Sequence, residues 1–291
     1  MENDKVLVTN SLGEFISEIV NIRAPKADGR ADFQWYRGHA DKTWELIPKI
    51  QRSFGGNEEE IFRRERDLTN DFQARACILP ATNSKPKLSE HASWLTLMQH
   101  YGLPTRLLDW SRSPLVALYF AVYEEAHLEK DACVWILTPG NLNLHESLEN
   151  LPQFEDVEHT NSYIRNMSDD TIAAMIYTAF RRWDLSDNQE EISPDDKKFN
   201  HRFNALRGKI AACYSTEADS RVYNQYSAFT VHNSLKKLDD FCEGSILKHI
   251  VIPGKRKKWL EYELSVCGIT HSYVFPDFEN LARVVRKWHQ I

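Results

Sequence analysis

The sequence predicts an α+β fold built on one mostly antiparallel mixed sheet with flanking helices and a helical insertion. Strand-like runs are separated from one another by helical segments, and the connections between them are long. No internal repeat or low-complexity tract interrupts this pattern. Hydrophobic residues make up 42% of the 291 residues and aromatic residues 11%, which is enough for a real core and argues against a disordered chain.

The first half of the chain alternates helices with extended runs. Ser11, followed by Glu14 three residues later, is a capping box at the start of the first helix. Gly102 closes a helix that Ser89 caps, and Ser113 opens another whose first turn accepts Pro114. The predicted elements are helix 11–22, strand 33–38, helices 57–76 and 89–102, the extended run 104–111, and helix 113–127.

The second half contains a segment of different character. Residues 140–205 are acidic, poor in β-branched runs and interrupted by the polar stretch 184–198. They are predicted to form a mostly helical insertion with one exposed loop, inside a single domain that spans 1–291. The elements around it are predicted as strands 132–139, 220–232, 246–254 and 269–276, and helices 255–268 and 277–289.

Bulk properties exclude several classes of protein. The net charge of −6 argues against a protein whose main task is to coat nucleic acid. The five cysteines lie far apart and outside CxxC pairs, so neither a disulfide framework nor a metal site is expected. The first residues show no basic region followed by an apolar stretch, so no signal peptide is expected, and no run approaches the ~18 apolar residues of a membrane span. A cytoplasmic protein is therefore expected.

Arg37 is the first residue that points to a site, because a guanidinium inside a strand-like run needs a partner. Arg106 and Asp109 lie three residues apart in another extended run and so point to opposite faces of an ideal strand. Each then meets a different neighbour, and Arg37 is the natural partner of Asp109. The same three residues are also compatible with a buried ion-pair network that only fixes strand register.

Four further residues add polar chemistry. Ser111 and Ser113 flank a helix start, where free backbone N–H groups suit a phosphate or carboxylate, although both serines are also ordinary caps. His100 is a candidate acid, base or hydrogen-bond donor, or a structural histidine. Gln225, on the predicted strand 220–232, is placed to hold a ribose hydroxyl or a carbonyl. The alternative is a polar strand face that lies against the insertion.

The chain resembles the FRG domain family. The resemblance rests on the motif Tyr36-Arg37-Gly38, on residues 100–121 (HYGLPTRLLDWSRSPLVALYFA) and on residues 221–229 (RVYNQYSAF). In the last segment Tyr226-Ser227 stands where a glycine is usual. The resemblance covers roughly 30–120 and 215–285 and implies an FRG-type fold, but no defined activity.

A weaker resemblance is to the Arg–Ser-x-Ser–Glu layout of ADP-ribosyltransferases. It implies an NAD-binding effector of the toxin or phage-defence type, with NAD as its substrate and a protein or nucleic acid as acceptor. Arg37 would hold the NAD phosphates and ribose with Arg106 and Asp109 nearby. Ser111 and Ser113 would support the nicotinamide pocket, and Tyr36, Trp35 or Tyr119 would stack on a ring. Gln225 stands where those enzymes have the catalytic glutamate, and Glu217, eight residues earlier, is a candidate substitute.

Three hypotheses follow, and whether the chain is an enzyme is left open among them. An NAD-using enzyme requires that Arg37, His100, Arg106, Ser111 and Gln225 converge on one open pocket. A non-catalytic module would bind a nucleotide or a partner and signal through the insertion. A purely structural role requires that Arg37 and Asp109 pair with each other and are closed off from solvent.

Overall fold

The computed structural model describes residues 7–23, 33–76, 78–79, 86, 91–146, 165–166, 208–214, 223–241 and 244–289. The strands of these residues are β1 (Leu7–Val8), β2 (Trp35–His39), β3 (Leu107–Ser111), β4 (Ala132–Leu137), β5 (Arg165–Asn166), β6 (Ile210–Tyr214), β7 (Ser227–His232) and β8 (Leu247–Ile252). The helices are α1 (Leu12–Ile22), α2 (Lys49–Ser53), α3 (Glu58–Ala76), α4 (His91–His100), α5 (Pro114–Val122), α6 (Pro139–His145), α10 (Lys257–Val266), α11 (His271–Val274) and α12 (Phe278–His289).

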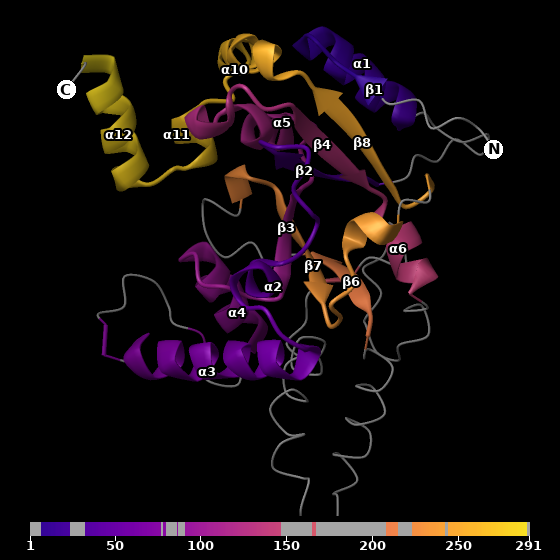
Figure 1. The fold of residues 1–291 in the computed structure, drawn as a ribbon. Coiled ribbons are helices and arrows are strands. Elements are labelled where there is room, and N and C mark those ends of the chain that lie inside the picture. The colour runs from indigo at the N-terminus through magenta and orange to yellow at the C-terminus, as the bar shows by residue number, and fades with distance from the viewer. Residues whose placement is uncertain are drawn as a thin grey trace, which may run out of the picture.

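The eight strands form one sheet in the order β1-β8-β4-β2-β3-β7-β6-β5 (Figure 1). Five neighbouring pairs run antiparallel. The pairs at the two edges, β1 with β8 and β5 with β6, run parallel. The predicted α+β fold with one mostly antiparallel mixed sheet is therefore confirmed. The predicted insertion 140–205 lies outside the described residues, apart from part of α6 and the short strand β5.

The sheet is divided in its middle. β2 and β3 are joined at one residue pair, Tyr36 with Ser111. By contrast, β2 pairs with β4 at five positions, and β3 pairs with β7 at five. The sheet therefore consists of one half formed by β1, β8, β4 and β2 and another formed by β3, β7, β6 and β5. We call the line between these halves the β2–β3 seam.

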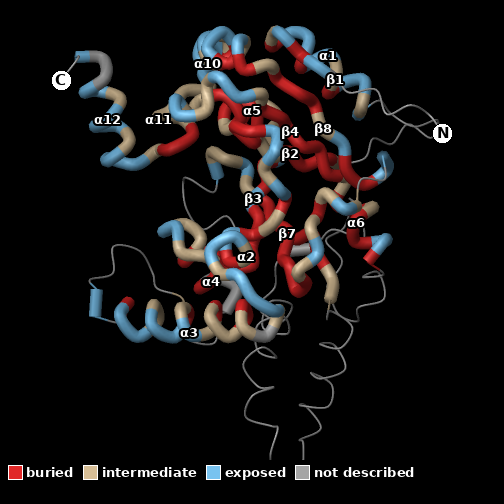
Figure 2. The backbone as a smooth tube through the Cα atoms, in the orientation of Figure 1, coloured by how far each residue is buried: buried red, intermediate tan, exposed pale blue. Residues whose placement is uncertain are grey.

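Two hydrophobic clusters stabilise the sheet. One contains Tyr36 of β2 and covers it with apolar residues of α1, α5 and α10, among them Phe15, Leu118 and Leu260. The other contains Trp35 and apolar residues of both halves of the sheet. In Figure 2 the central strands and α5 are mostly buried, whereas α3, α10 and α12 present exposed surface. The seam thus lies within the packed interior, where its geometry is held from several sides.

Gly38 sets the distance between β2 and α5. A Cβ atom at this position would lie 1.9 Å from the main-chain oxygen of Ala117 and 2.6 Å from the main-chain nitrogen of Ala121. Both of these atoms belong to the backbone of α5, so no side-chain rotation can relieve the contact. The glycine of the Tyr36-Arg37-Gly38 motif is required because the helix backbone rests directly on the strand.

Most of the predicted elements are confirmed, although the helix predicted for 113–127 ends at Val122 and is followed by a separate 3-10 turn at Glu125–His127. The hydroxyl of Ser11 accepts from the backbone N–H of Glu14 (3.2 Å), as a capping residue should. Gly102 ends α4 with φ +78°, and the backbone N–H of Leu103 donates to the carbonyl of Met98 (2.9 Å). The other proposed cap of this helix, Ser89, lies outside the described residues.

Two strand predictions are wrong in part. Residues 269–276 were expected to be extended, but the Thr270 hydroxyl accepts from the backbone N–H of Tyr273 (3.3 Å) and starts the short helix α11. In 220–232 the strand begins only at Ser227. Before it the backbone N–H of Tyr226 donates to the carbonyl of Tyr223, and Tyr226 has φ +50°. The positive φ falls where the FRG resemblance shows a glycine as usual.

Gly38→Ala is expected to destabilise the protein by about 3 kcal/mol or more, because the added methyl group forces β2 and α5 apart. Denaturant unfolding measures the change in free energy. Gly13→Ala in α1 is the matched control, since nothing lies within 4 Å of its added Cβ atom. Equal stability of the two variants would contradict the close approach of α5 to β2.

Candidate functional site

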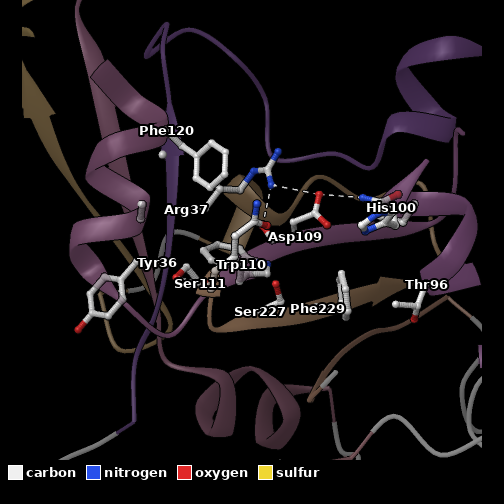
Figure 3. A pocket seen from close by; sticks show the side chains of 14 residues that line it. Tyr36, Arg37, Thr96, His100, Asp109, Trp110, Ser111, Phe120, Ser227 and Phe229 are labelled. Carbon is white, nitrogen blue, oxygen red and sulfur yellow. Dashed lines mark hydrogen bonds and ion pairs between the residues drawn. The ribbon is translucent and has the colours of Figure 1, made fainter. Parts of the chain in front are cut away.

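A cavity of about 240 Å³ opens beside the β2–β3 seam (Figure 3). Its wall combines one cation, one carboxylate, amides, hydroxyls and aromatic rings. The lining residues are Tyr36, Arg37, Gly38, Thr96, Gln99, His100, Asp109, Trp110, Ser111, Ala117, Phe120, Gln225, Ser227 and Phe229. They come from both halves of the sheet and from α4 and α5, so the cavity exists only when these parts are assembled.

Arg37 crosses the seam. Its Nη1 donates to the main-chain carbonyl of Asp109 on β3 (2.6 Å), and its Nε donates to Nε2 of His39 (3.1 Å). Its Nη2 has no hydrogen-bond partner among the described residues, and the side chain is 17% exposed. Burial lowers the pKa of Arg37 to about 10, with the charge of Asp109 opposing the shift. The guanidinium therefore stays charged at neutral pH and keeps a donor for a ligand.

Asp109 pairs with Arg37, as predicted, but the pair is open to solvent. The carboxylate Oδ2 lies 3.9 Å from Nη1 of Arg37 and accepts from Nε2 of Gln99 (2.7 Å). The Asp109 side chain is 53% exposed. A purely structural role for the pair requires closure from solvent, and the structure does not show it.

The two serines connect backbone segments around the cavity. The Ser111 hydroxyl donates to the main-chain carbonyl of Gln225 (2.7 Å) and accepts from the backbone N–H of Ser113 (3.0 Å). The Ser113 hydroxyl accepts from the backbone N–H of Val116 (3.4 Å) and caps α5. Ser111 lines the cavity whereas Ser113 does not. The hydrogen bonds of the two serines connect β3 to the turn before β7 and to the start of α5.

Gln225 and His100 both line the cavity. The Gln225 amide nitrogen donates to the main-chain carbonyl of Val274 in α11 (3.1 Å), which orients the side chain. Its amide oxygen has no hydrogen-bond partner among the described residues. His100 lies in the last turn of α4 with its ring 5.0 Å from that of Tyr101. The structure thus brings Arg37, His100, Asp109, Ser111 and Gln225 together.

Arg106 is placed elsewhere, which corrects its assignment to the ligand site. It forms a buried ion pair with Glu65 of α3, and both side chains are 1% exposed. The carboxylate accepts from the Arg106 backbone N–H (2.7 Å) and from its Nε (2.5 Å), while Nη1 donates to Asn233 (3.1 Å). The guanidinium also lies 4.2 Å from the ring centroid of Phe62. Arg106 therefore attaches α3 to the sheet.

Tyr36 does not join the cluster of candidate side chains. The Tyr36 ring points away from the cavity in Figure 3, belongs to the hydrophobic cluster under α5, and donates its hydroxyl to Gln34 (3.1 Å). It is not placed to stack on a ligand in this cavity. Glu217 lies outside the described residues.

Several lining residues were not predicted, among them Gln99, Phe229 and Phe120. Gln99 comes directly before His100, and its amide holds the carboxylate of Asp109. Phe229 is the strand partner of Asp109, and Phe120 lies on α5. Phe229 was recognisable only through the pairing of β3 with β7, because apolar residues carry no chemical signal of their own. The rings of Phe120 and Phe229 supply part of the apolar wall of the cavity.

Two buried histidines lie close to the Arg37 charge. Burial and then the charge of Arg37 lower the pKa of His39 and that of His232 to about 3. For His39 the neutral form is also required because its Nε2 accepts from Arg37. Within the part of the chain that the structure describes, no group of three or more His, Cys, Asp or Glu side chains is placed to hold a metal ion.

Comparison with known families agrees with the motifs around the cavity. Residues 33–130 match the FRG domain family, so this chain contains an FRG domain. Arg37, His100, Asp109 and Ser111 fall inside the matched span, whereas Gln225 lies beyond it. No curated protein and no solved structure matches the chain. In the described part of the chain, no helix is both long and apolar enough to cross a membrane.

Arg106→Leu is expected to destabilise the fold by about 3–5 kcal/mol, because it leaves the Glu65 carboxylate buried without its partner. The double variant Arg106→Leu/Glu65→Leu removes both charges and is expected to recover most of this loss. Denaturant unfolding of wild type, the single variant and the double variant measures both effects. A single variant as stable as wild type would contradict the buried pair.

The free energy of unfolding is expected to fall as the pH drops below about 6.5. In this range His39 and His232 bind protons in the unfolded chain but stay neutral in the folded protein. The sign follows from folded pKa values that lie below the unfolded ones. Each histidine lowers the free energy of unfolding by about 1.4 kcal/mol for each pH unit below about 6.5, and the effect levels off near pH 3. His232→Gln should lower the slope of this pH dependence by that amount, measured by denaturant unfolding between pH 6 and 4. An unchanged slope would show that His232 titrates normally.

Proposed function

We propose that the cavity of this FRG domain binds a nucleotide, with NAD⁺ as the ligand to test first. The observation that carries the proposal is the Arg37 guanidinium, which stays charged, lines the cavity and keeps Nη2 without a partner among the described residues. A planar guanidinium is well suited to the oxygens of a phosphate. The likeness to the ADP-ribosyltransferase layout supports NAD⁺ over other nucleotides.

Other groups of the wall match the ring and the ribose of a nucleotide. Phe120 is partly exposed and offers aromatic surface for a base or nicotinamide ring, whereas Phe229 is buried and closes the wall. The amide oxygen of Gln225 is an acceptor for a ribose hydroxyl, and its amide nitrogen is held by α11. A ligand bound here would therefore meet a cation, apolar rings and a fixed amide within one cavity.

The size of the cavity indicates which part of the ligand it takes. Its volume of about 240 Å³ is below the roughly 300–1,000 Å³ that is usual for sites that enclose a drug-sized ligand. We infer that one half of the dinucleotide, the nicotinamide riboside with its phosphate, enters the cavity. The other half would then extend outward, where Arg52 of α2 is near enough for its charge to lower the pKa of Arg37.

Transfer of ADP-ribose is the second candidate function. It is favoured because Arg37, Ser111 and Gln225, three positions of the transferase-like layout, line the same cavity. It is opposed by the chemistry of Gln225, since an amide has no charge to stabilise an oxocarbenium-like transition state. An NAD⁺-consuming effector of the toxin or defence type, acting on a protein or nucleic acid, would need another group for that step.

Arg37→Ala is expected to weaken NAD⁺ binding about 10- to 100-fold, because hydrogen bonds to a charged group are worth about 1.5–3 kcal/mol. Isothermal titration calorimetry measures the affinity, and nicotinamide release is followed in the same samples. Arg63→Ala is the matched control, since Arg63 is a half-exposed arginine of α3 that does not line the cavity.

The outcomes separate the hypotheses. Binding without nicotinamide release supports the nucleotide-binding module. Release that disappears in Arg37→Ala supports the enzyme. Wild-type protein that neither binds nor consumes NAD⁺, with Arg37→Ala chiefly destabilised, would overturn the proposal and leave Arg37 as a structural bridge across the seam.

A further inference from the structure

The cavity presents two opposite charges side by side. Nη1 of Arg37 and Oδ2 of Asp109 are 3.9 Å apart, and both residues line the wall. Figure 3 shows the guanidinium and the carboxylate lying next to each other, with dashed lines to their partners. The wall is therefore zwitterionic rather than simply basic.

The two groups neutralise each other only partly. Nη1 of Arg37 donates to the main-chain carbonyl of Asp109, and Oδ2 of Asp109 accepts from Gln99. Among the described residues, Nη2 of Arg37 and Oδ1 of Asp109 have no hydrogen-bond partner. Each group is thus held in place by a neutral partner and keeps one atom for a ligand. The carboxylate, at 53% exposure, remains accessible.

An aromatic ring lies beside the carboxylate. Asp109 of β3 and Phe229 of β7 are directly opposite each other in the antiparallel ladder, so their side chains project on the same face. Both line the cavity. Phe229 is only 3% exposed, so it closes the wall beside the carboxylate and is not a surface on which a ring could stack. A cationic ring bound beside Asp109 would gain from the carboxylate, whereas a neutral ring in the same place would not.

A ligand that is only anionic gains from Arg37 but is repelled by Asp109. A ligand that carries both an anion and a cation matches both groups. Oxidised nicotinamide nucleotides have this character, since the pyridinium ring is cationic and the phosphate is anionic. In the reduced nucleotides the ring is neutral and the match to Asp109 is lost.

We propose that Asp109 makes the site selective for oxidised over reduced nicotinamide nucleotides, with the pyridinium ring beside Asp109 and the phosphate on Arg37. This inference rests on the proposed function and adds a specificity-determining residue to it. Asp109 is a positioning and recognition group here and takes no part in bond making.

The test compares NAD⁺ with NADH by isothermal titration calorimetry on the full chain. Wild type is expected to bind NAD⁺ roughly 5- to 20-fold more tightly than NADH, the size of one charge interaction near a protein surface. Asp109→Asn keeps the shape and an acceptor for Gln99 but removes the charge, so the preference should fall to about twofold or less. Asp67→Asn on α3, a half-exposed carboxylate away from the cavity, should keep the wild-type preference.

The outcomes distinguish this inference from the proposal beneath it. If wild type binds neither nucleotide, the proposed function itself fails, and the inference fails with it. If wild type binds both with equal affinity, the proposed function stands and the selectivity is overturned. A preference that persists in Asp109→Asn overturns the role of Asp109. Thermal unfolding of Asp109→Asn shows whether the variant is folded, as expected for an exposed position.

Discussion

The structure depends on the bond that Arg37 makes across the β2–β3 seam. β2 and β3 share one residue pair, so the main-chain carbonyl of Asp109 lacks the strand partner that a continuous sheet would supply. The guanidinium supplies a donor instead. A side chain thereby replaces a ladder hydrogen bond, and the same side chain is brought to the wall of the cavity. One residue therefore contributes both to the continuity of the sheet and to the wall of the cavity.

The three residues of the Tyr36-Arg37-Gly38 motif have three separate tasks. Tyr36 is buried under α5, and Gly38 lets the backbone of α5 lie against β2. Arg37 points the opposite way and reaches β3. The strand alternation explains this division, because successive side chains of a strand project to opposite faces. Within three residues of sequence the motif therefore supplies a core side chain, a contact surface for a helix and a cation at the wall of the cavity.

Local patterns predicted most of the fold but only part of the site. Capping signals such as Ser11 and Gly102 act within a few residues, which is why those helix ends could be recognised. The partner of Arg106 could not, because Glu65 is 41 residues away and nothing in its local sequence marks it as buried. Phe229 became part of the wall through strand pairing. The strand expected at 269–276 failed because the cap at Thr270 outweighs the β-propensity of the aromatic residues that follow it.

The buried pair of Glu65 and Arg106 has a mechanical consequence. Arg106 directly precedes β3, and Glu65 lies in the middle of α3. The ion pair therefore attaches this long helix to the half of the sheet that carries Asp109. The half that contains β2, β4 and β8 packs against α5 and α10 through a separate hydrophobic cluster. Each half of the sheet thus has its own helical support, and Arg37 is one of several contacts that connect the halves across the seam. A ligand bound beside Arg37 would contact both halves and would stabilise their relative position.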